Sequence, residues 1–434
     1  MSATSPTRAL DLERVLDEPV DWRYKSFPAV PPVPIRAVGQ QGWNALGGDF
    51  MSPIMVLKES ALRHNLDEMA AYCRRNDIYL APHVKTHMAP QLFQMQLDAG
   101  AWALTVANVS QARVWRAFGA DRVVLANELV EPGSIRWVAE ELNRDRNFEF
   151  FCLVDSVAEV TLLESSLGNW NLGRRLRVLL EVGFPGGRTG CRSPEEARDV
   201  AAAVARSRHL SLAGVESFEG IIHAQSAAAA VEAVERFLRG MRDVVVELDS
   251  AGLFSGAEEV ILSAGGSAFL DRVAAVLSEP WALSRPARVV LRSGCYLTHD
   301  AVHYAQASPF GGRLSGTEPL QEALEVWGTV LSMPEPGLAL LGFGKRDVPY
   351  DMELPVPRVV KRGGDAVCPF EGGASIFALN DQHAYLRLPL KEDVRVGDLV
   401  GCGISHPCTA FDKWRLIPVV DDEYRVLDAV LTYF

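Results

Sequence analysis

One pattern recurs eight times between residues 79 and 300: a short apolar run rich in β-branched residues, a polar residue at its end, and an amphipathic segment behind it. Runs that are apolar almost throughout are typical of strands buried on both faces, as in parallel sheets. Eight such strand–helix units predict a closed (β/α)₈ barrel of the TIM type. The eight runs are 79–85, 103–108, 122–127, 148–156, 176–184, 210–220, 258–266 and 288–296.

The segments between these runs carry helical signals. After the fifth run, Ser193 is placed as an N-cap, Pro194 as the first helical residue and Glu196 as the glutamate of a capping box. A doubly wound open sheet is the alternative arrangement, but the chain lacks the glycine fingerprint of a dinucleotide-binding fold. Between the sixth and seventh runs, apolar residues recur at helical spacing, namely Val231, Val234, Leu238, Met241, Val245 and Leu248.

The character of the sequence changes on both sides of the predicted barrel. Residues 320–434 show no long helical pattern but several strand-like runs separated by Gly, Pro and Asp, which predicts a smaller β domain. The first 50 residues are irregular and rich in proline, and we expect them to pack on that β domain. The predicted division is therefore an N-terminal extension at 1–50, a barrel at 51–305 and a C-terminal β domain at 306–434.

Composition excludes several classes of partner. The formal net charge is −12 and the chain has no run of lysine and arginine, so we expect neither nucleic acid nor a membrane as partner. No apolar stretch approaches the ~20 residues that span a bilayer, and residues 1–22 do not resemble a signal peptide. Seven scattered cysteines, an odd number, argue against a disulfide framework. We therefore expect a cytoplasmic protein of ordinary globular composition.

Polar residues follow the predicted strands at the end where barrels of this type place their active sites. Lys85 ends the first run, and a lysine there must be paired, neutralised or used covalently, because an unpaired buried charge is costly. A Schiff base with an aldehyde cofactor satisfies this requirement, and a salt-bridged structural lysine is the alternative. Arg188 follows the fifth run, and Glu219 and His223 follow the sixth.

Two glycine-containing segments, 263–267 and 292–296, follow the seventh and eighth runs. Loops at these two positions of a barrel often hold a phosphate, because small residues let backbone N–H groups approach its oxygens. Ser267 is placed at the start of the next helix, so its hydroxyl and the helix N-terminus would point the same way. Ordinary turn chemistry is the alternative for either segment alone.

A candidate metal site lies in the predicted β domain. His406 and Cys408 are two residues apart, so on a strand their side chains would point to the same side and could bind one divalent metal. Zinc suits this pair best. A buried free cysteine beside a hydrogen-bonded histidine is the alternative, and nearby Cys402 leaves a closed structural zinc site open as a third possibility.

Together these motifs match a known family. From Ser52 to Tyr296 the chain resembles the N-terminal barrel of the alanine racemase-like, fold-type III pyridoxal-phosphate enzymes. Its motifs resemble the D-serine dehydratase and D-threonine aldolase branch of that group, and the resemblance covers nearly the whole chain beyond residue 50. The motifs are PHVKTH around Lys85, GGRTG around Arg188, SAGGS at 263–267, RSGCY at 292–296, NDQH ending at His383, and SHPCTAFDKW from Ser405.

The resemblance implies roles for these residues. Lys85 would carry pyridoxal 5′-phosphate as a Schiff base, and Arg188 would lie beside the pyridine ring. His406 and Cys408 match the positions that bind a catalytic zinc in eukaryotic-type D-serine dehydratases. The family also suggests a homodimer in which the β domain of one subunit closes the barrel of the other. The phosphate would be held mainly by backbone N–H groups of Gly265, Gly266, Ser267, Gly294, Cys295 and Tyr296.

Two departures from the family pattern bear on the substrate pocket. The segment before Arg188 is longer and less acidic than the family pattern, and Phe218 stands where the branch often has Tyr or His. The aldolases more typically have His-x-Asp where this chain has His406 and Cys408, which favours dehydration.

The leading hypothesis is a metal-dependent dehydratase that converts a D-β-hydroxy amino acid, such as D-serine or D-threonine, to a 2-oxo acid and ammonia. A D-threonine-type aldolase is the alternative enzyme. A racemase fits less well, because it has no use for a metal at the β-oxygen. A non-catalytic pyridoxal-phosphate carrier is the alternative of another class, although such carriers resemble the barrel alone. The sequence leaves open which hydroxy amino acid is the substrate and whether manganese replaces zinc.

Overall fold

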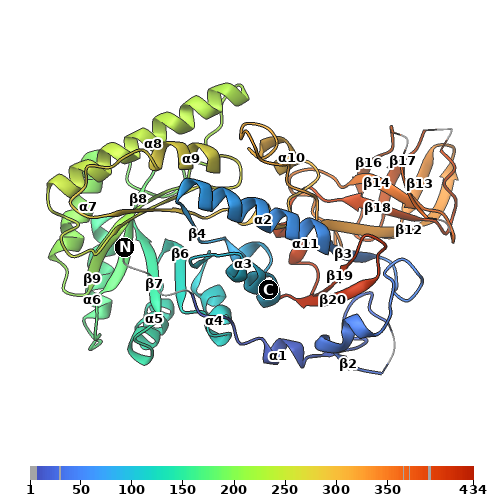
Figure 1. The fold of residues 1–434 in the computed structure, drawn as a ribbon, viewed down its shortest axis with the longest axis horizontal. Helices are drawn as coiled ribbons and strands as arrows, with labels where there is room; N and C mark the ends of the chain where they lie inside the picture. Colours follow the sequence, from blue (N-terminus) through green and yellow to red (C-terminus); the bar gives the residue numbers. More distant parts are fainter. Residues whose placement is uncertain (1–6, 29–30, 365, 371, 390–391) are drawn as a thin grey trace.

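Eight parallel strands form the body of the left half of Figure 1, in the order β4-β11-β10-β9-β8-β7-β6-β5. The computed structural model describes residues 7–28, 31–364, 366–370, 372–389 and 392–434. All eight strands predicted from the sequence are present, and the predicted barrel is confirmed. They are β4 (Tyr79–Leu80), β5 (Leu104–Val106), β6 (Arg122–Glu128), β7 (Glu149–Val154), β8 (Leu176–Val182), β9 (Leu210–Ser217), β10 (Val260–Ala264) and β11 (Ala287–Leu291).

The barrel closes between its first two strands. The N–H of Trp102 donates to the carbonyl of Leu80 at 2.7 Å, and the N–H of Thr105 donates to Pro82 at 2.9 Å. One further parallel bridge joins His83 to Thr105. These contacts connect β4 to β5 and complete the circle that β11 begins on the other side of β4.

The first strand is shorter than the sequence predicted. We expected it to run to Lys85, but β4 ends at Leu80, and Lys85 lies in a 3₁₀ turn, η2 (Val84–Thr86). Pro82 accounts for the difference, because proline has no N–H to donate to the strand ladder. The chain therefore leaves the sheet before it reaches the lysine.

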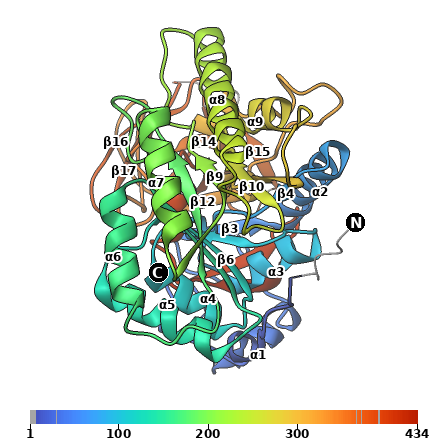
Figure 2. The ribbon, with the colours of Figure 1, turned by 90° about the vertical axis from the view of Figure 1, so that its left-hand side faces the viewer.

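Helices cover the outside of the barrel, as Figure 2 shows. The predicted N-cap is confirmed: the Ser193 side chain accepts from the N–H of Glu196 at the start of α7, with Pro194 as the first residue. Ser226 caps α8 in the same manner. The helices are α2 (Glu59–Asn76), α3 (Pro90–Asp98), α4 (Val109–Ala117), α5 (Pro132–Arg144), α6 (Val157–Leu167), α7 (Pro194–Arg206), α8 (Ala227–Ser250) and α9 (Leu270–Leu277).

Small and large apolar side chains alternate inside the barrel and fill it. Trp102 and Phe151 pack there at a ring separation of 6.0 Å, beside Ala81, Ala103 and Ala213. The interior is a packed core, as expected for a barrel of this size, and a ligand must therefore bind at one of its ends.

The right half of Figure 1 is the predicted C-terminal β domain. Its long strand β12 (Leu324–Glu335) pairs with β13, β18 and β3 (Ile54–Lys58), so a strand that precedes the barrel completes the sheet. Its other elements are η3 (Cys295–Leu297) and α10 (His303–Ala307) in the connection, β13 (Leu338–Leu341), β14 (Val356–Lys361), β15 (Val367–Pro369), β16 (Ser375–Leu379), β17 (Ala384–Arg387), β18 (Leu399–Gly403), α11 (Cys408–Phe411), β19 (Leu416–Val420) and β20 (Val426–Leu431).

The N-terminal segment lies against both halves of the molecule. The N–H of Ala45 donates to Tyr424 at 2.9 Å, and the N–H of Val426 donates to Trp43 at 2.9 Å. Nearer the N-terminus, the N–H of Asp11 donates to a carbonyl of the barrel, that of Phe118. Residues 1–6 and 29–30 of the predicted extension lie outside the described residues. The elements are α1 (Glu13–Leu16), β1 (Pro19–Val20), β2 (Val33–Pro34) and η1 (Ile35–Gln40).

Within the described ranges, none of the helices combines the length and the apolar composition that a bilayer crossing requires.

Candidate active site

Lys85 lies at the mouth of the barrel, in the turn that follows β4. Its side chain is exposed, and among the described residues its ammonium group forms no hydrogen bond and no ion pair. The structure therefore does not contain the salt bridge that was the alternative explanation for this lysine. Its charge lies close enough to His83 to help depress the pKa of that imidazole, although burial is the larger cause.

His406 lies in the turn after β18 and Cys408 is the first residue of α11, so neither lies on a strand. The expectation of strand geometry was wrong, because Pro407 adopts helical backbone angles (φ −58°, ψ −41°) and starts the short helix. The two side chains nevertheless lie close together, because the thiol of Cys408 is near enough to the imidazole of His406 to raise its pKa.

The turn at Cys408 packs directly against the barrel mouth. Its sulfur lies 3.3 Å from the hydroxyl of Thr86, the residue after Lys85, and 3.7 Å from the sulfur of Cys295 in the loop after β11. The predicted metal motif and the predicted cofactor lysine are therefore brought together within one chain. The sequence could not show this, because Thr86 and Cys408 are 322 positions apart.

The two thiols differ in their ionisation. The hydrogen bond that Cys295 donates lowers the pKa of Cys408 well below its ordinary value, aided by hydrogen bonds from His406 and Thr86 and opposed by burial. The same hydrogen bond to Cys408, together with burial, raises the pKa of Cys295. Cys408 is thus the thiol of the pair that ionises more readily, and a thiolate is the form of cysteine that binds metal.

Asp351 orients the histidine. Its carboxylate lies 2.6 Å from Nδ1 of His406 and accepts a hydrogen bond from the Thr409 hydroxyl at 2.8 Å. Burial alone would lower the pKa of His406, but its hydrogen bonds with Cys408 and Asp351 raise it to about 9. A carboxylate on one imidazole nitrogen is the usual support for a histidine that binds metal through the other. No local sequence pattern marked Asp351, which lies in a loop 55 residues before His406.

The donor set fits a divalent metal in its chemistry, with one thiolate and one supported imidazole. In the part of the chain that the structure describes, no three His, Cys, Asp or Glu side chains form a group that could hold a metal ion. The pair alone leaves room for ligands that the protein does not supply, which is the arrangement of catalytic rather than structural metal sites. Cys402, which left a closed structural zinc site open as a possibility, is fully buried in β18.

The loop after β10 already holds an anion of the protein itself. The N–H groups of Gly265 and Gly266 donate to the two carboxylate oxygens of Glu219, at 3.1 and 2.8 Å. Gly265 has a φ of +97°, a conformation that favours glycine, and this conformation turns the two N–H groups to one side. Two N–H groups of this loop thus hold a carboxylate together, which is the kind of geometry that a phosphate site requires.

Other N–H groups of the two predicted phosphate loops are free to accept a ligand. Those of Ser267, Gly294 and Cys295 donate to no acceptor among the described residues. At Gly294 a Cβ atom would lie 2.4 Å from the carbonyl oxygen of His83, so only glycine permits this close approach of the loop to the Lys85 turn. Small residues and free donors at this edge of the barrel fit the phosphate of pyridoxal phosphate.

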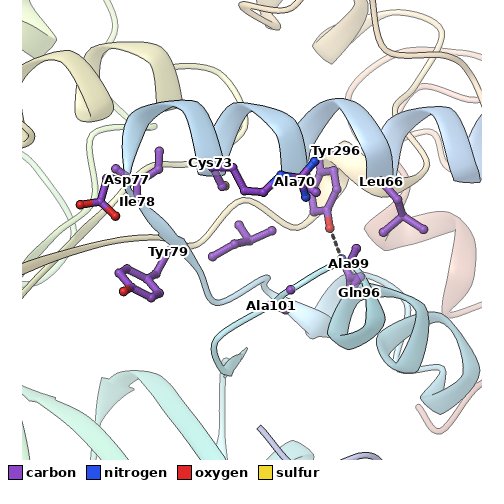
Figure 3. Close-up of a pocket in the computed structure, with 13 residues that line it drawn as sticks. Leu66, Ala70, Cys73, Asp77, Ile78, Tyr79, Gln96, Ala99, Ala101 and Tyr296 are labelled. Atoms are coloured by element: carbon purple, nitrogen blue, oxygen red, sulfur yellow. Dashed lines mark hydrogen bonds between the residues drawn. The ribbon is translucent and has the colours of Figure 1, made fainter. Parts of the chain in front are cut away.

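Two of the predicted phosphate residues differ in detail from the expectation. Helix α9 begins at Leu270, so Ser267 is not at its N-cap, and its hydroxyl forms no capping bond. The Tyr296 ring points away from the loop into a cavity of about 350 Å³ between α2 and α3, where its hydroxyl accepts from Gln96 at 3.0 Å (Figure 3). This cavity is separate from the mouth at Lys85, and only the backbone of Tyr296 faces the loop.

Arg188 lies in the loop after β8, with its guanidinium 5.0 Å from the centre of the Phe218 ring. No carboxylate of the described residues pairs with it. The Phe218 ring also covers the phosphate loop, since a Cβ on Gly266 would lie 3.1 Å from it. An exposed, unpaired arginine beside an aromatic face is a site for an anionic group.

Sequence reasoning missed a group of carboxylates at the same end of the barrel. Glu128 ends β6, Glu181 lies near the end of β8, and Glu216 lies near the end of β9. Burial and the neighbouring Glu181 raise the pKa of Glu128 to about 8. Arg292 pairs with Glu216 and donates to the carbonyl of Ser217 at 2.9 Å. The signal that the sequence offered for these carboxylates was a glutamate at the end of an apolar run, as at Glu128.

Two family models match the chain. The model described as "Alanine racemase, N-terminal domain" matches residues 57–268, and the one described as "Putative serine dehydratase domain" matches residues 323–420. The first match contains Lys85 and the loop after β10, and the second contains His406 and Cys408. This chain belongs to the alanine racemase-like, fold-type III pyridoxal-phosphate enzymes. Within them it falls in the D-serine dehydratase and D-threonine aldolase branch.

Individual relatives of this fold-type III chain agree with the family. It is 24% identical over 374 residues to a D-threonine aldolase of Arthrobacter sp., covering 86% of this chain and 89% of that protein. The crystal structure of D-threonine aldolase from Filomicrobium marinum matches with a TM-score of 0.72 at 23% identity, over 88% of this chain and 95% of that one. D-threo-3-hydroxyaspartate dehydratase from Delftia sp. HT23 matches with a TM-score of 0.68 at 18% identity, over 88% and 97%.

Proposed function

We propose that this protein is a pyridoxal-phosphate- and metal-dependent dehydratase that converts a D-β-hydroxy amino acid to a 2-oxo acid and ammonia. The observation that carries the proposal is the contact between Cys408 and Thr86, at 3.3 Å. It sets a candidate metal pair beside the candidate cofactor lysine. A reaction that both labilises a proton at Cα and expels a hydroxyl at Cβ needs these two functions side by side.

Lys85 binds the cofactor and moves the proton. Its side chain has no competing partner, so its amine can form the covalent bond to the cofactor aldehyde. When bound, pyridoxal phosphate supplies an electron sink for the negative charge that develops at Cα. The amine of Lys85, once released, takes the proton from the substrate Cα as general base.

The remaining barrel residues hold the anionic groups. The free N–H groups of Ser267, Gly294 and Cys295 bind the phosphate, with Gly265, Gly266 and Tyr296 shaping the same two loops. Arg188, stacked on Phe218, supports the pyridine ring or the substrate carboxylate.

His406 and Cys408 bind the metal, and Asp351 holds the imidazole in position. A divalent ion on this pair supplies a Lewis acid, and the substrate β-hydroxyl is otherwise a poor leaving group. Zinc is the metal we propose for a thiolate–imidazole pair. A D-threo-3-hydroxyaspartate dehydratase of the same fold has been solved as a cysteine-to-alanine mutant in the metal-free form, which supports a metal-binding role for cysteine in such enzymes.

An aldolase is the second candidate, because the two relatives with the highest identity quoted above are D-threonine aldolases. In that reaction the hydroxyl is deprotonated and the Cα–Cβ bond breaks. We favour dehydration because the second metal residue is Cys408, and the aldolase pattern has an aspartate there.

Product analysis tests the choice. We expect D-serine or D-threonine to give a 2-oxo acid and ammonia, with activity lost after chelation and restored by zinc. Glycine and an aldehyde from D-threonine would establish the aldolase instead. Stable cofactor binding with no turnover of any D-β-hydroxy amino acid, including 3-hydroxyaspartate, would point to a cofactor carrier and contradict the proposal.

Three further features belong to this proposal. They are a cytoplasmic location, a homodimer, and the division of the chain at residues 51–305 and 306–434. Within one chain the β domain already contacts the barrel mouth at Cys408, so we propose that a second subunit adds to the entrance of the site and does not supply the metal pair.

A further inference from the structure

Cys295 and Cys408 lie closer together than their assigned roles require. Cys295 belongs to the loop after β11 and Cys408 to the β domain, 113 positions later, yet their sulfurs are 3.7 Å apart. Cys295 is 6% exposed, and its side chain faces Cys408, Thr86 and Tyr304 rather than the phosphate loop after β10. In the proposed function the backbone N–H of Cys295 binds the phosphate. Its thiol has no assigned role.

The separation of the two sulfurs matches that of two thiolates on one tetrahedral ion. With zinc–sulfur bonds of about 2.3 Å and a tetrahedral angle, two sulfurs on one zinc lie about 3.8 Å apart. His406 is two residues from Cys408 in the same turn, and Asp351 lies 2.6 Å from Nδ1 of its imidazole, which leaves the other ring nitrogen for a metal. Two sulfurs and one nitrogen therefore border the same place beside Thr86.

We propose that Cys295 is a third protein ligand of the metal bound by His406 and Cys408. The inference rests on the proposed function, and it deepens it: a Cys₂His set with one open position is an established form of catalytic zinc site. The open position is where the substrate hydroxyl would bind.

Closing three donors around one ion requires a small movement, since no three described His, Cys, Asp or Glu side chains already form such a group. The backbone at Cys295 stays fixed, because its carbonyl accepts the N–H of His299 at 2.8 Å.

The third ligand determines which metal binds. Two thiolates and an imidazole favour zinc strongly over manganese and magnesium, which prefer oxygen ligands. The number of sulfur ligands therefore decides a question that the His406–Cys408 motif left open.

Cobalt substitution measures the number of thiolate ligands. We would replace the metal of the holoprotein with Co²⁺ and record the sulfur-to-cobalt charge-transfer absorption in the wild type, Cys295→Ser and Cys408→Ser. We expect each single variant to lose about half of this absorption, because one of two thiolates is removed. Cys368→Ser is the matched control, because this cysteine lies in β15, away from the site, and it should leave the absorption unchanged.

Zinc affinity gives a second, independent readout. Loss of a partner that only supports a ligand costs 10- to 100-fold in affinity, so we expect Cys295→Ser to cost at least about 100-fold. The visible absorbance of the bound pyridoxal phosphate should persist in Cys295→Ser, because serine keeps the backbone N–H, and this verifies that the variant is folded.

The outcomes separate the inference from the proposed function. If Cys408→Ser abolishes the cobalt absorption while Cys295→Ser leaves it and the zinc affinity unchanged, Cys295 is not a ligand and the proposed function stands. If the wild type shows no cobalt absorption, the metal assignment fails and the inference fails with it. Zinc-edge X-ray absorption of the wild type needs no variant: two sulfur neighbours are expected, and a single one would overturn the inference.

Discussion

The two ends of the barrel differ in what surrounds their glutamates. Glutamates pair with arginines at one end and face other carboxylates at the other. At the end where the strands begin, Glu149 lies between Arg122 and Arg177, with the Arg177 guanidinium 2.5 Å from its carboxylate. Arg288 and Glu259 form another such pair at 2.8 Å. Burial would raise the pKa of Glu149, but the two arginines outweigh it and lower the pKa.

At the end where the strands finish, carboxylates face each other. Glu128 and Glu181 are neighbours there, and burial is the first cause that raises the pKa of each. Glu159 at the start of α6 also has its pKa raised by burial, to about 8. Buried oxygens of all three glutamates lack a hydrogen-bond partner among the described residues.

The comparison separates stability from function. Paired charges where the strands begin link neighbouring strands. This end of a barrel usually serves the stability of the fold. Carboxylates whose pKa is raised by burial destabilise the fold. Such groups are tolerated where ligands bind, and an unpaired lysine and an unpaired arginine lie at the same end. Four expected effects test this division, and they follow in order of size.

The largest effect is expected for Lys85→Ala. We expect loss of the visible cofactor absorbance and at least about a 10³-fold loss of turnover, because no other amine is placed to form the Schiff base. The stability of the cofactor-free protein should not fall, since the Lys85 ammonium has no partner to leave behind. Absorbance spectra and urea unfolding of the cofactor-free protein measure the two effects.

If Lys85→Ala unfolds at a markedly lower urea concentration than the wild type, the lysine is structural. The difference between the two ends would then not hold. Lys58→Ala is the matched control, since this lysine pairs with Glu325 at 3.6 Å and is remote from η2. It should retain the cofactor absorbance.

The second effect concerns a buried ion pair at the functional end, between Arg292 and Glu216. Arg292→Met leaves the Glu216 carboxylate, 1% exposed, without its cation. We expect a loss of about 3–5 kcal/mol in the free energy of unfolding, which is typical when one partner of a buried pair is removed. Arg177→Met at the other end should cost only about 0–1 kcal/mol, because Glu149 keeps Arg122. The expected difference comes from burial and from the second arginine beside Glu149, so equal losses in urea unfolding would contradict this explanation.

Much of this division could be predicted from the sequence, and the parts that failed have physical causes. Apolar periodicity predicted all eight strands, and the motifs from Lys85 to the segment that begins at Ser405 together predicted the family. The strand expected at His406 and Cys408 was wrong, because Pro407 starts a helical turn.

Contacts between distant segments were beyond the sequence. Nothing local brings Cys295 to Cys408, or the Glu219 carboxylate to the N–H groups of Gly265 and Gly266. Such contacts depend on how the barrel closes and how the β domain docks on it, and one sequence carries no signal for either.

The third effect is a pH dependence of opposite sign at the two ends. The pKa of Glu128 is about 8 in the folded protein against an ordinary 4.5. Between these values the unfolded chain releases a proton that the folded protein keeps, so the free energy of unfolding falls as pH rises. Glu128→Gln removes this loss, and we expect it to gain about 1 kcal/mol relative to wild type between pH 5 and pH 8, after allowance for partial exposure.

Glu149→Gln should behave in the opposite sense. The pKa of Glu149 is lowered, so its contribution to stability is present above the ordinary pKa and is lost as pH falls through the lowered value. The variant should be less stable than wild type at pH 8 and approach it in acid. Urea unfolding at pH 5 and pH 8 checks Glu128→Gln, and Glu149→Gln also needs a measurement below its ordinary pKa of 4.5, where its contribution is lost. The same sign for the two variants would remove the distinction between the ends.

The smallest effect is expected for Phe218→Leu, which removes the ring under Arg188. A cation–π contact at an exposed arginine contributes about 0.5–1 kcal/mol, so positioning of the guanidinium should weaken by that amount. Because Arg188 faces an anionic group rather than the reacting bond, we expect KM to rise about two- to fivefold with little change in kcat. Phe184→Leu is the control, since this ring stacks on Phe237 at 5.4 Å and not on Arg188. A fall in kcat alone would place Phe218 at the chemistry itself, and the functional end would then depend on its aromatic lining as well as on its charges.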